Sequence, residues 1–255
     1  MKRPVLSAEP DDATLWQRLR ALTAARIGLP RAGASLATAP LLAFQLAHAR
    51  ARDAVWDELD EMKLCAALAT LWPSVVSVSS GADTRQKFLM RPDFGRHLDD
   101  RSRSALARHA GTYDTVFIVS GGLSARAVEA HAAAVLSEVL PPLRAGGWRI
   151  GPLIVTRNGR VAIGDEVAAI LGASSGAVLI GERPGLSAPD SMGAYLTWAP
   201  HAQTTDAERN CISNIRPAGI GYADAAAKIA YLLGAMRRHR LSGVALKDDS
   251  DRALT

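Results

Sequence analysis

The feature that most constrains the fold of this chain is an alternation of short apolar runs with helical patterns after Pro73. The apolar runs, rich in Val, Ile and Leu, cover residues 75–78, 115–119, 150–155, 178–180 and 194–198. Helical spacing of apolar residues appears instead at 124–139, 164–171 and 222–238. Strands that alternate with helices predict right-handed βαβ units, and continuous apolar runs are typical of strands covered on both faces. The predicted fold is therefore α/β with a largely parallel sheet.

A different pattern precedes this region. Leu15, Leu19 and Leu22 recur at helical intervals, and Leu42 and Leu46 repeat the spacing after Pro40. The prolines and glycines of residues 28–40 separate these two helices, and a third helix is expected over 52–69. We therefore expect a helical N-terminal region over residues 1–72 and a sheet domain over 73–255.

Composition excludes several classes of protein. Among 255 residues, 48% are hydrophobic and 22% are charged, which is inconsistent with wholesale disorder, a collagen-like repeat or a coiled-coil rod. The net charge of +5 comes from scattered Lys and Arg without interleaved aromatic residues. Such residues favour solvated helix faces over a nucleic-acid-binding stripe, so no nucleic-acid partner is expected.

The cellular compartment is inferred from cysteine usage and from the absence of apolar segments. Two cysteines, Cys65 and Cys211, are too few for a disulfide framework or a four-ligand zinc site. No apolar leader follows Lys2 and Arg3. The longest uncharged stretch, 32–49, contains Pro40 and too many polar residues to cross a bilayer. We expect a soluble cytoplasmic protein that does not enter a membrane.

Three loops are the natural place for a ligand. In an open α/β sheet, ligands bind outside the carboxyl ends of the strands. The loops that follow Val119, Val155 and Ile180 each contain glycine, which lets the backbone approach a ligand closely, and the last two also carry charge. These loops are predicted to converge on one site.

Catalytic signatures are missing from the sequence. It contains no Walker P-loop, complete G-x-G-x-x-G, G-x-S-x-G elbow or H-E-x-x-H, and its six histidines are isolated from one another. No Asp lies two residues before a His, so any bound corrin would keep its own base on cobalt. Gly121 and Gly122, before a helix, leave a phosphate site open as the minor alternative to a tight turn. We predict no catalytic residue and no metal-ligating residue.

Two further segments are more easily explained by structure than by chemistry. Arg91 and Asp93 are expected to pair across a turn that Pro92 and Gly95 define, with an interface role as the alternative. Cys211, beside aliphatic residues and far from any His, is more typical of a small buried hydrophobe than of a nucleophile.

Six segments in this order resemble the small (light) subunit of ethanolamine ammonia-lyase, over about residues 24–244. They are Phe88-Leu89-Met90-Arg91-Pro92-Asp93-Phe94-Gly95-Arg96, Ser120-Gly121-Gly122-Leu123-Ser124, Leu140-Pro141-Pro142-Leu143, Arg157-Asn158-Gly159-Arg160-Val161, Gly181-Glu182-Arg183-Pro184-Gly185-Leu186 and Cys211-Ile212-Ser213-Asn214-Ile215. The resemblance implies a Rossmann-like domain of an adenosylcobalamin-dependent lyase that converts ethanolamine to acetaldehyde and ammonia. It also implies a hetero-oligomer, in which the large subunit binds ethanolamine and carries the catalytic groups while cobalamin lies between the subunits.

The same resemblance implies which residues contact the cofactor. The corrin contacts of the family correspond to Val161, Glu182 and Cys211 in this sequence. The Glu182 carboxylate would accept hydrogen bonds from the amides on the corrin rim, while Val161 and Cys211 would supply apolar and small soft contacts. Arg160 and Arg183 flank these positions and are candidates for contacts with the nucleotide phosphate or with the partner subunit.

Two departures from the family leave alternatives open. Many members have Asp where Gly121 stands, and longer members begin with a segment that directs the enzyme to a bacterial microcompartment, whereas this sequence starts close to its first helix. Location inside a microcompartment therefore stays open. The competing functional hypothesis is a free-standing Rossmann-like nucleotide-binding or regulatory protein, which shares only the sheet topology.

Overall fold

A computed structural model describes residues 12–250 of the chain. The chain divides into two compact units, of which the first ends at Arg50 and the second begins at Ala51. The N-terminal residues 1–10, for which no leader is expected, lie outside the described residues. The structure does not test the expected boundary at residue 72, which stays a prediction.

The first unit contains the helix pair that the leucine spacing predicts. It comprises α1 (Asp12–Ala21), a short antiparallel pair formed by β1 (Arg31–Ala32) and β2 (Ser35–Leu36), and most of α2 (Thr38–Trp56). Pro40 lies in the first turn of α2, where a missing N–H breaks no helical hydrogen bond. The third helix, expected from residue 52, begins later: α3 spans Glu61–Ala69, and Asp60 caps it by accepting a hydrogen bond from the Lys63 amide.

The second unit alternates strands and helices as expected. In chain order after α3 it contains β3 (Val75–Ser77), α4 (Arg85–Met90), α5 (Asp100–Ala107), β4 (Val116–Ser120), α6 (Ala125–Ala145), β5 (Leu153–Thr156), α7 (Ile163–Leu171), β6 (Ser175–Gly181), β7 (Met192–Trp198), β8 (Arg209–Ile215) and α8 (Tyr222–His239). Short 3-10 turns lie at Phe94–Arg96, Asp206–Glu208 and Gly243–Ala245. The class α/β is confirmed.

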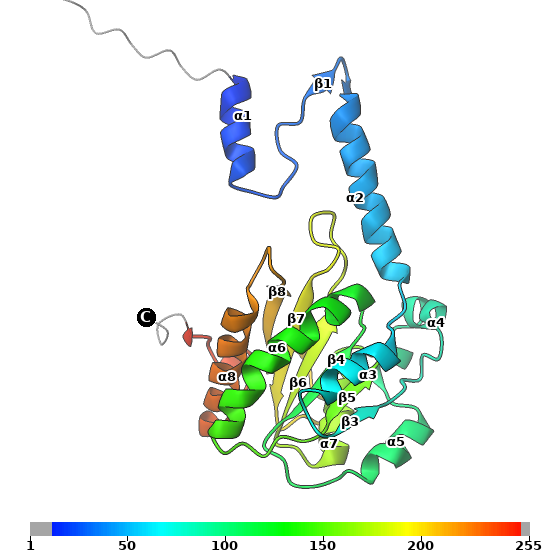
Figure 1. The fold of residues 1–255 in the computed structure, drawn as a ribbon, viewed down its shortest axis with the longest axis vertical. Coiled ribbons are helices and arrows are strands. Elements are labelled where there is room, and N and C mark those ends of the chain that lie inside the picture. Colours follow the sequence, from blue (N-terminus) through cyan, green and yellow to red (C-terminus); the bar gives the residue numbers. More distant parts are fainter. Residues whose placement is uncertain (1–11, 251–255) are drawn as a thin grey trace, which may run out of the picture. The chain divides into compact units, whose positions relative to one another are not determined.

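One six-stranded sheet, in the order β3-β5-β4-β6-β7-β8, organises this unit (Figure 1). Strands β3, β5, β4 and β6 run parallel to one another, whereas β7 and β8 are antiparallel additions beside β6. Strand β8 was not predicted, because its sequence Arg-Asn-Cys-Ile-Ser-Asn-Ile mixes polar and apolar residues. It lies at the edge of the sheet, where half of a strand can face solvent.

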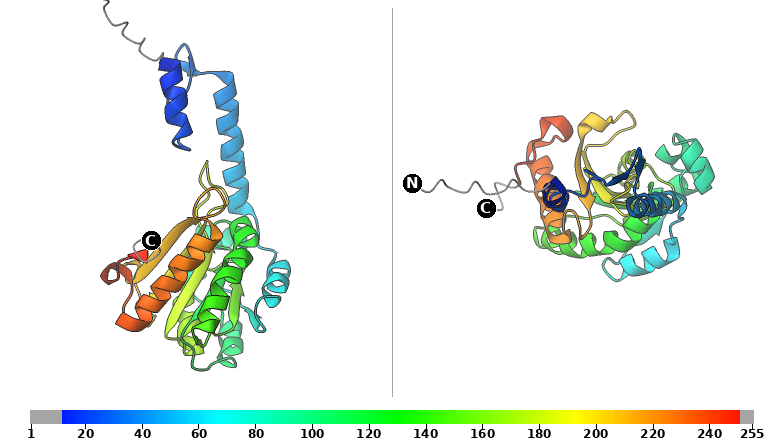
Figure 2. Two further views of the ribbon diagram at one scale, coloured as in Figure 1. Left: turned by 60° about the vertical axis from the view of Figure 1, so that its left-hand side comes forward. Right: turned by 90° about the horizontal axis from the view of Figure 1, so that it is seen from above.

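Helices cover both faces of the sheet. Figure 2 shows α6 and α8 side by side across one face, where residues such as Phe117 and Val119 join them in the larger core cluster. Their neighbour Ile118 points to the other face and packs with residues of α5 and α7. Because successive side chains of a strand point to opposite faces, a strand covered on both faces is apolar throughout. This accounts for the continuous apolar sequence of β4.

A helix that crosses a bilayer needs about 20 predominantly apolar residues. No helix between residues 12 and 250 is both long and apolar enough to span a membrane. This finding concerns membrane-spanning helices alone, and the expectation that no membrane is a partner stays a prediction.

Candidate functional site

The site lies at the carboxyl ends of β4, β5 and β6, where the three glycine-containing loops converge as predicted. They enclose part of an open cavity of about 430 Å³. Its lining comes from all three loops and from the two antiparallel strands: Gly122, Leu123, Arg160, Val161, Ile180, Gly181, Glu182, Arg183, Tyr195 and Ser213. Two of the three predicted cofactor contacts, Val161 and Glu182, are therefore in one cavity.

Close backbone approach joins the first and third loops. The Leu123 amide donates to the Gly181 carbonyl at 2.9 Å, and Gly122 has a φ of +54°. A Cβ atom at Gly181 would lie 2.0 Å from the carbonyl oxygen of Ser124. Glycine is needed at both positions, because Gly122 has a left-handed backbone and Gly181 has no room for a side chain. A turn covers Gly122 and Leu123, and the phosphate alternative for Gly121 and Gly122 is not tested.

Glu182 is half-buried and held by hydroxyl and amide donors. Its Oε1 accepts from Ser213 Oγ at 2.5 Å, and its Oε2 accepts from Ser191 Oγ and from the Asn214 amide, the latter at 3.1 Å. These donors come from β8 and from the residue directly before β7. A carboxylate has about four acceptor positions, so Oε1 keeps one for a further donor.

Val161 is half-buried and borders a second cavity of about 410 Å³ as well as the first. It packs against the core cluster on the α5 and α7 face of the sheet. The loop before it is anchored by Ser120 Oγ, which donates to the Gly159 carbonyl at 2.8 Å. Val161 therefore offers a fixed apolar edge between the two cavities.

Cys211 is exposed, so its interpretation as a small buried hydrophobe is wrong. It lies on β8 directly opposite Tyr195 of β7. Partial burial against the sheet raises the pKa of the Cys211 thiol, and burial together with that thiol raises the pKa of Tyr195. Cys211 does not line the main cavity itself. Two of its neighbours do: Tyr195, opposite it on β7, and Ser213, two residues further along β8.

The predicted Arg91 and Asp93 pair is confirmed and borders the second cavity through Asp93. Arg91 Nε and Nη2 donate to the two carboxylate oxygens at 3.0 and 2.7 Å. This bidentate pair keeps the pKa of Asp93 below its usual value, chiefly through the Arg91 side-chain hydrogen bond. The pair is exposed and stabilises a turn, as the sequence indicated.

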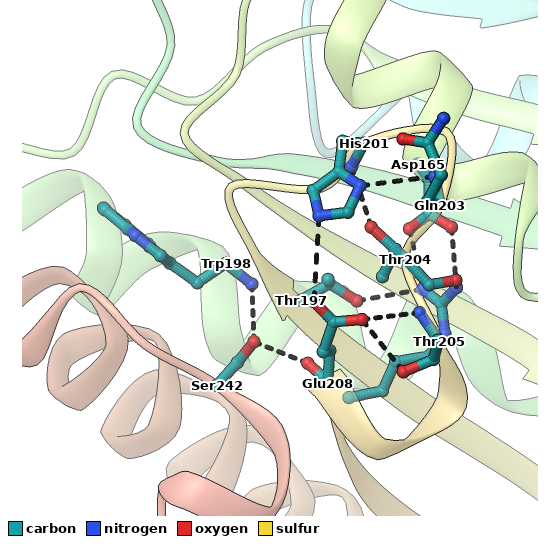
Figure 3. Close-up of polar contacts among 10 residues, drawn as sticks. Asp165, Thr197, Trp198, His201, Gln203, Thr204, Thr205, Glu208 and Ser242 are labelled. Carbon is teal, nitrogen blue, oxygen red and sulfur yellow. Dashed lines mark hydrogen bonds and ion pairs between the residues drawn. The ribbon is translucent and has the colours of Figure 1, made fainter.

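A polar network that the sequence did not reveal holds the connection between β7 and β8 (Figure 3). His201, Thr204, Thr205 and Glu208 bond to one another within this connection. Beneath it, Arg209 Nη1 and Nη2 donate to the Asp165 carboxylate at 2.7 and 2.6 Å. Both side chains are buried, with exposed fractions of 2% for Arg209 and 8% for Asp165. The ion pair joins the first turn of α7 to the start of β8.

The other chemistry-bearing residues are dispersed. His131 is buried and contacts the Tyr222 hydroxyl and the Asp190 carbonyl, whereas the other five histidines are exposed. Across residues 12–250, no group of three or more His, Cys, Asp or Glu side chains is placed to hold a metal ion. The site thus consists of loops and strand ends with polar binding groups.

These features define a class: an α/β domain with an open cavity at the carboxyl edge of its sheet. Comparison with known proteins makes the assignment specific. The chain belongs to the ethanolamine ammonia-lyase light chain (EutC) family, whose model matches residues 13–247.

Curated relatives agree with this assignment along nearly their whole length. The ethanolamine ammonia-lyase small subunit of Xanthomonas campestris pv. campestris (strain ATCC 33913) is 51% identical over 249 residues, which cover 96% of this chain and 91% of that protein. The small subunit of Rhodopseudomonas palustris (strain BisA53) is 53% identical over 233 residues, 91% of this chain and 89% of its own. The resemblance inferred from six short segments is thus confirmed, and the chain is similar to a subunit of a lyase.

Proposed function

We propose that this chain is the cobalamin-contacting small subunit of an adenosylcobalamin-dependent ethanolamine ammonia-lyase, which converts ethanolamine to acetaldehyde and ammonia. Family membership supports the subunit assignment, and the shared cavity of Val161 and Glu182 supports the cofactor contact. In this proposal the second unit is a Rossmann-like domain, and the large subunit binds ethanolamine. A cytoplasmic location, free or inside a bacterial microcompartment, belongs to the same proposal.

The residues present fit an edge of the cofactor. Corrin side chains end in primary amides, and the remaining acceptor position on Glu182 Oε1 suits an amide donor. Val161 provides apolar contact beside it, and Cys211 is small enough to leave room next to Tyr195. A cavity of about 430 Å³ is far smaller than a whole corrinoid, so a partner must enclose the remainder.

The roles of this chain follow from those contacts. Adenosylcobalamin supplies the radical chemistry of the reaction, and this chain's residues bind and orient the cofactor. Ser191, Ser213 and the Asn214 amide hold the Glu182 carboxylate in place, so that its open acceptor position has a fixed direction. Such preorganisation reduces the entropy lost when a ligand binds. The acid, base and radical-handling residues are assigned to the large subunit.

The alternative of a free-standing nucleotide-binding or regulatory protein is less well supported. It rests on sheet topology alone, and sheet topology is shared by proteins of many functions. Family membership over residues 13–247 favours the lyase subunit.

The purified chain is expected to release no ammonia from ethanolamine, and to support turnover only with the large subunit and adenosylcobalamin. The reason is that neither the sequence nor the described residues assemble a catalytic group for the reaction. Ammonia release is measured for the chain alone, the large subunit alone and the mixture, each with cofactor. Turnover by the chain alone would contradict the proposal, and an inactive mixture of folded subunits would contradict it equally.

The isolated chain is also expected to aggregate, because α2 exposes several large apolar side chains. Leu42 is 59% exposed and Leu46 is 52% exposed, although their helical spacing is that of a buried stripe. Exposed apolar patches favour association. Sedimentation should show aggregates of the chain alone and a defined complex with the large subunit. Substituting Leu42→Gln and Leu46→Gln together should reduce aggregation, and a monodisperse wild-type monomer that ignores the large subunit would refute the prediction.

A further inference from the structure

Three arginines without a carboxylate partner gather at the two neighbouring cavities. Arg160 lines both cavities, Arg183 lines the first, and Arg96 lines the second. Within residues 12–250, no acidic side chain lies within ion-pair distance of any of the three. The carboxylates that line the same cavities are engaged elsewhere: Glu182 with Ser191, Ser213 and the Asn214 amide, Asp93 with Arg91, and Asp206 with Arg209.

Arg160 is held in a defined position, unlike a mobile surface arginine. Its amide donates to the Gly95 carbonyl at 2.7 Å, and its guanidinium lies over the Phe88 ring at 4.4 Å from the centroid. A Cβ at Gly95 would come within 3.1 Å of Arg160 Cγ, so glycine makes room for this side chain. Because the Phe88 ring is fully buried, the guanidinium rests on a rigid platform.

One hydrogen-bond donor of the Arg160 guanidinium lacks an acceptor among the described residues. Its Nε is buried and has no hydrogen-bond partner among residues 12–250. Burial, and then the charges of Arg183 and Arg96, lower the pKa of Arg160. A fixed cation with a free donor, beside two more cations, is an electrostatically unfavourable arrangement that an anion would relieve. The planar fork of arginine matches the oxygen geometry of phosphate.

We propose that Arg160, flanked by Arg183 and Arg96, binds a phosphate group, and that in the assembled enzyme this group is the phosphodiester of the cobalamin nucleotide tail. The inference rests on the proposed function and adds to it a phosphate-binding position. Val161 follows Arg160 in the chain, and Glu182 shares its cavity. One cofactor molecule would thus place its amide donors against the Glu182 carboxylate and its phosphodiester against the Arg160 guanidinium.

The test compares ligands that differ by one phosphate. Cobinamide lacks the nucleotide tail and its phosphate, whereas cobinamide phosphate carries the phosphate alone. Dissociation constants for cobalamin, cobinamide phosphate and cobinamide are measured by equilibrium dialysis on the two-subunit complex. In Arg160→Gln, the dissociation constants of cobalamin and cobinamide phosphate should rise about ten- to hundredfold. The constant for cobinamide should stay within about twofold of the wild-type value. Arg160→Lys, which keeps the charge, should be affected less.

Arg157→Gln is the matched control from the same loop. Arg157 is paired with Glu61 at 3.0 Å and lines a different cavity, so all three constants should be unchanged. Melting temperatures verify folding, and Arg160→Lys serves as the test if the glutamine variant does not fold. Inorganic phosphate should compete with cobalamin in the wild-type complex.

Three results would overturn the inference. An equal loss for cobinamide and cobinamide phosphate would mean that Arg160 supports the fold and not a phosphate. Weaker subunit association without phosphate dependence would assign the arginines to the partner subunit. If inorganic phosphate bound to Arg160 together with cobalamin, the site would accept free phosphate and not the tail. A wild-type complex that binds none of the corrinoids would instead refute the proposed function itself.

Discussion

Replacing Asp165 with asparagine is expected to lower the free energy of unfolding by about 3 to 5 kcal/mol, because it leaves the Arg209 charge buried without its partner. The Arg209 side chain is 2% exposed and makes two short hydrogen bonds to Asp165. Its other buried contacts, with the Thr197 hydroxyl and the Thr204 carbonyl, carry no charge, and its second carboxylate partner, Asp206, is exposed to solvent. Chemical denaturation of the purified complex, or of the chain kept soluble, measures the change.

Asp206 provides the matched control for this substitution. Its carboxylate lies 3.4 Å from Nε of the same arginine, but the side chain is 95% exposed. Asp206→Asn should therefore change stability little, since water screens an exposed ion pair. Replacing both buried partners with apolar residues, Asp165→Leu with Arg209→Met, should recover much of the loss. A loss below about 1 kcal/mol in Asp165→Asn would show that the pair is not the buried anchor described above.

The second large effect is expected at Glu182. Glu182→Ala should raise the dissociation constant of cobalamin for the two-subunit complex about ten- to hundredfold, the equivalent of one charge-assisted hydrogen bond of roughly 1.5 to 3 kcal/mol. The structure adds a second effect, because the same carboxylate joins Ser191, Ser213 and the Asn214 amide. The variant should therefore also melt at a lower temperature. Both quantities are measured on the same preparation.

Ser213→Ala separates the two roles of Glu182. It removes one internal donor to Oε1 but keeps the carboxylate, so it should lower the melting temperature and weaken corrin binding much less than Glu182→Ala does. If Glu182→Ala lowers the melting temperature with an unchanged dissociation constant, the carboxylate is structural and the proposed contact is wrong. If Glu182→Ala changed neither the melting temperature nor the dissociation constant, the hydrogen bonds described for Glu182 would be contradicted.

Much of the fold was predictable because its determinants are local. The apolar runs at 115–119 and 150–155 predict strands wherever they are placed, and the spacing over 124–139 predicts a helix from neighbouring residues alone. Exact ends were less predictable: α6 continues to Ala145 through Pro141 and Pro142, and α2 continues to Trp56. Strand β8 escaped prediction because an edge strand exposed to solvent lacks the continuous apolar pattern of its buried neighbours.

The sequence by itself also determined where a ligand site had to be sought. Once strands and helices alternate, glycine-containing loops after parallel strands meet at one edge of the sheet. The loops that carry Val161 and Glu182 do meet at one cavity, whereas the choice of these two residues came from the family resemblance and stays a prediction. The family, too, was recognisable from six short segments, because such motifs are contiguous in the chain.

Only the tertiary structure decided which side chains meet. The pairing of Tyr195 with Cys211 depends on the antiparallel register of two strands, and the contacts of Glu182 depend on where the edge strand β8 is added. Asp165 and Arg209 are 44 residues apart and come together because α7 packs beneath the connection from β7 to β8. The gathering of Arg96, Arg160 and Arg183 likewise joins three separate segments. Local patterns encode the elements, but contacts between distant side chains arise from the order and register in which those elements pack.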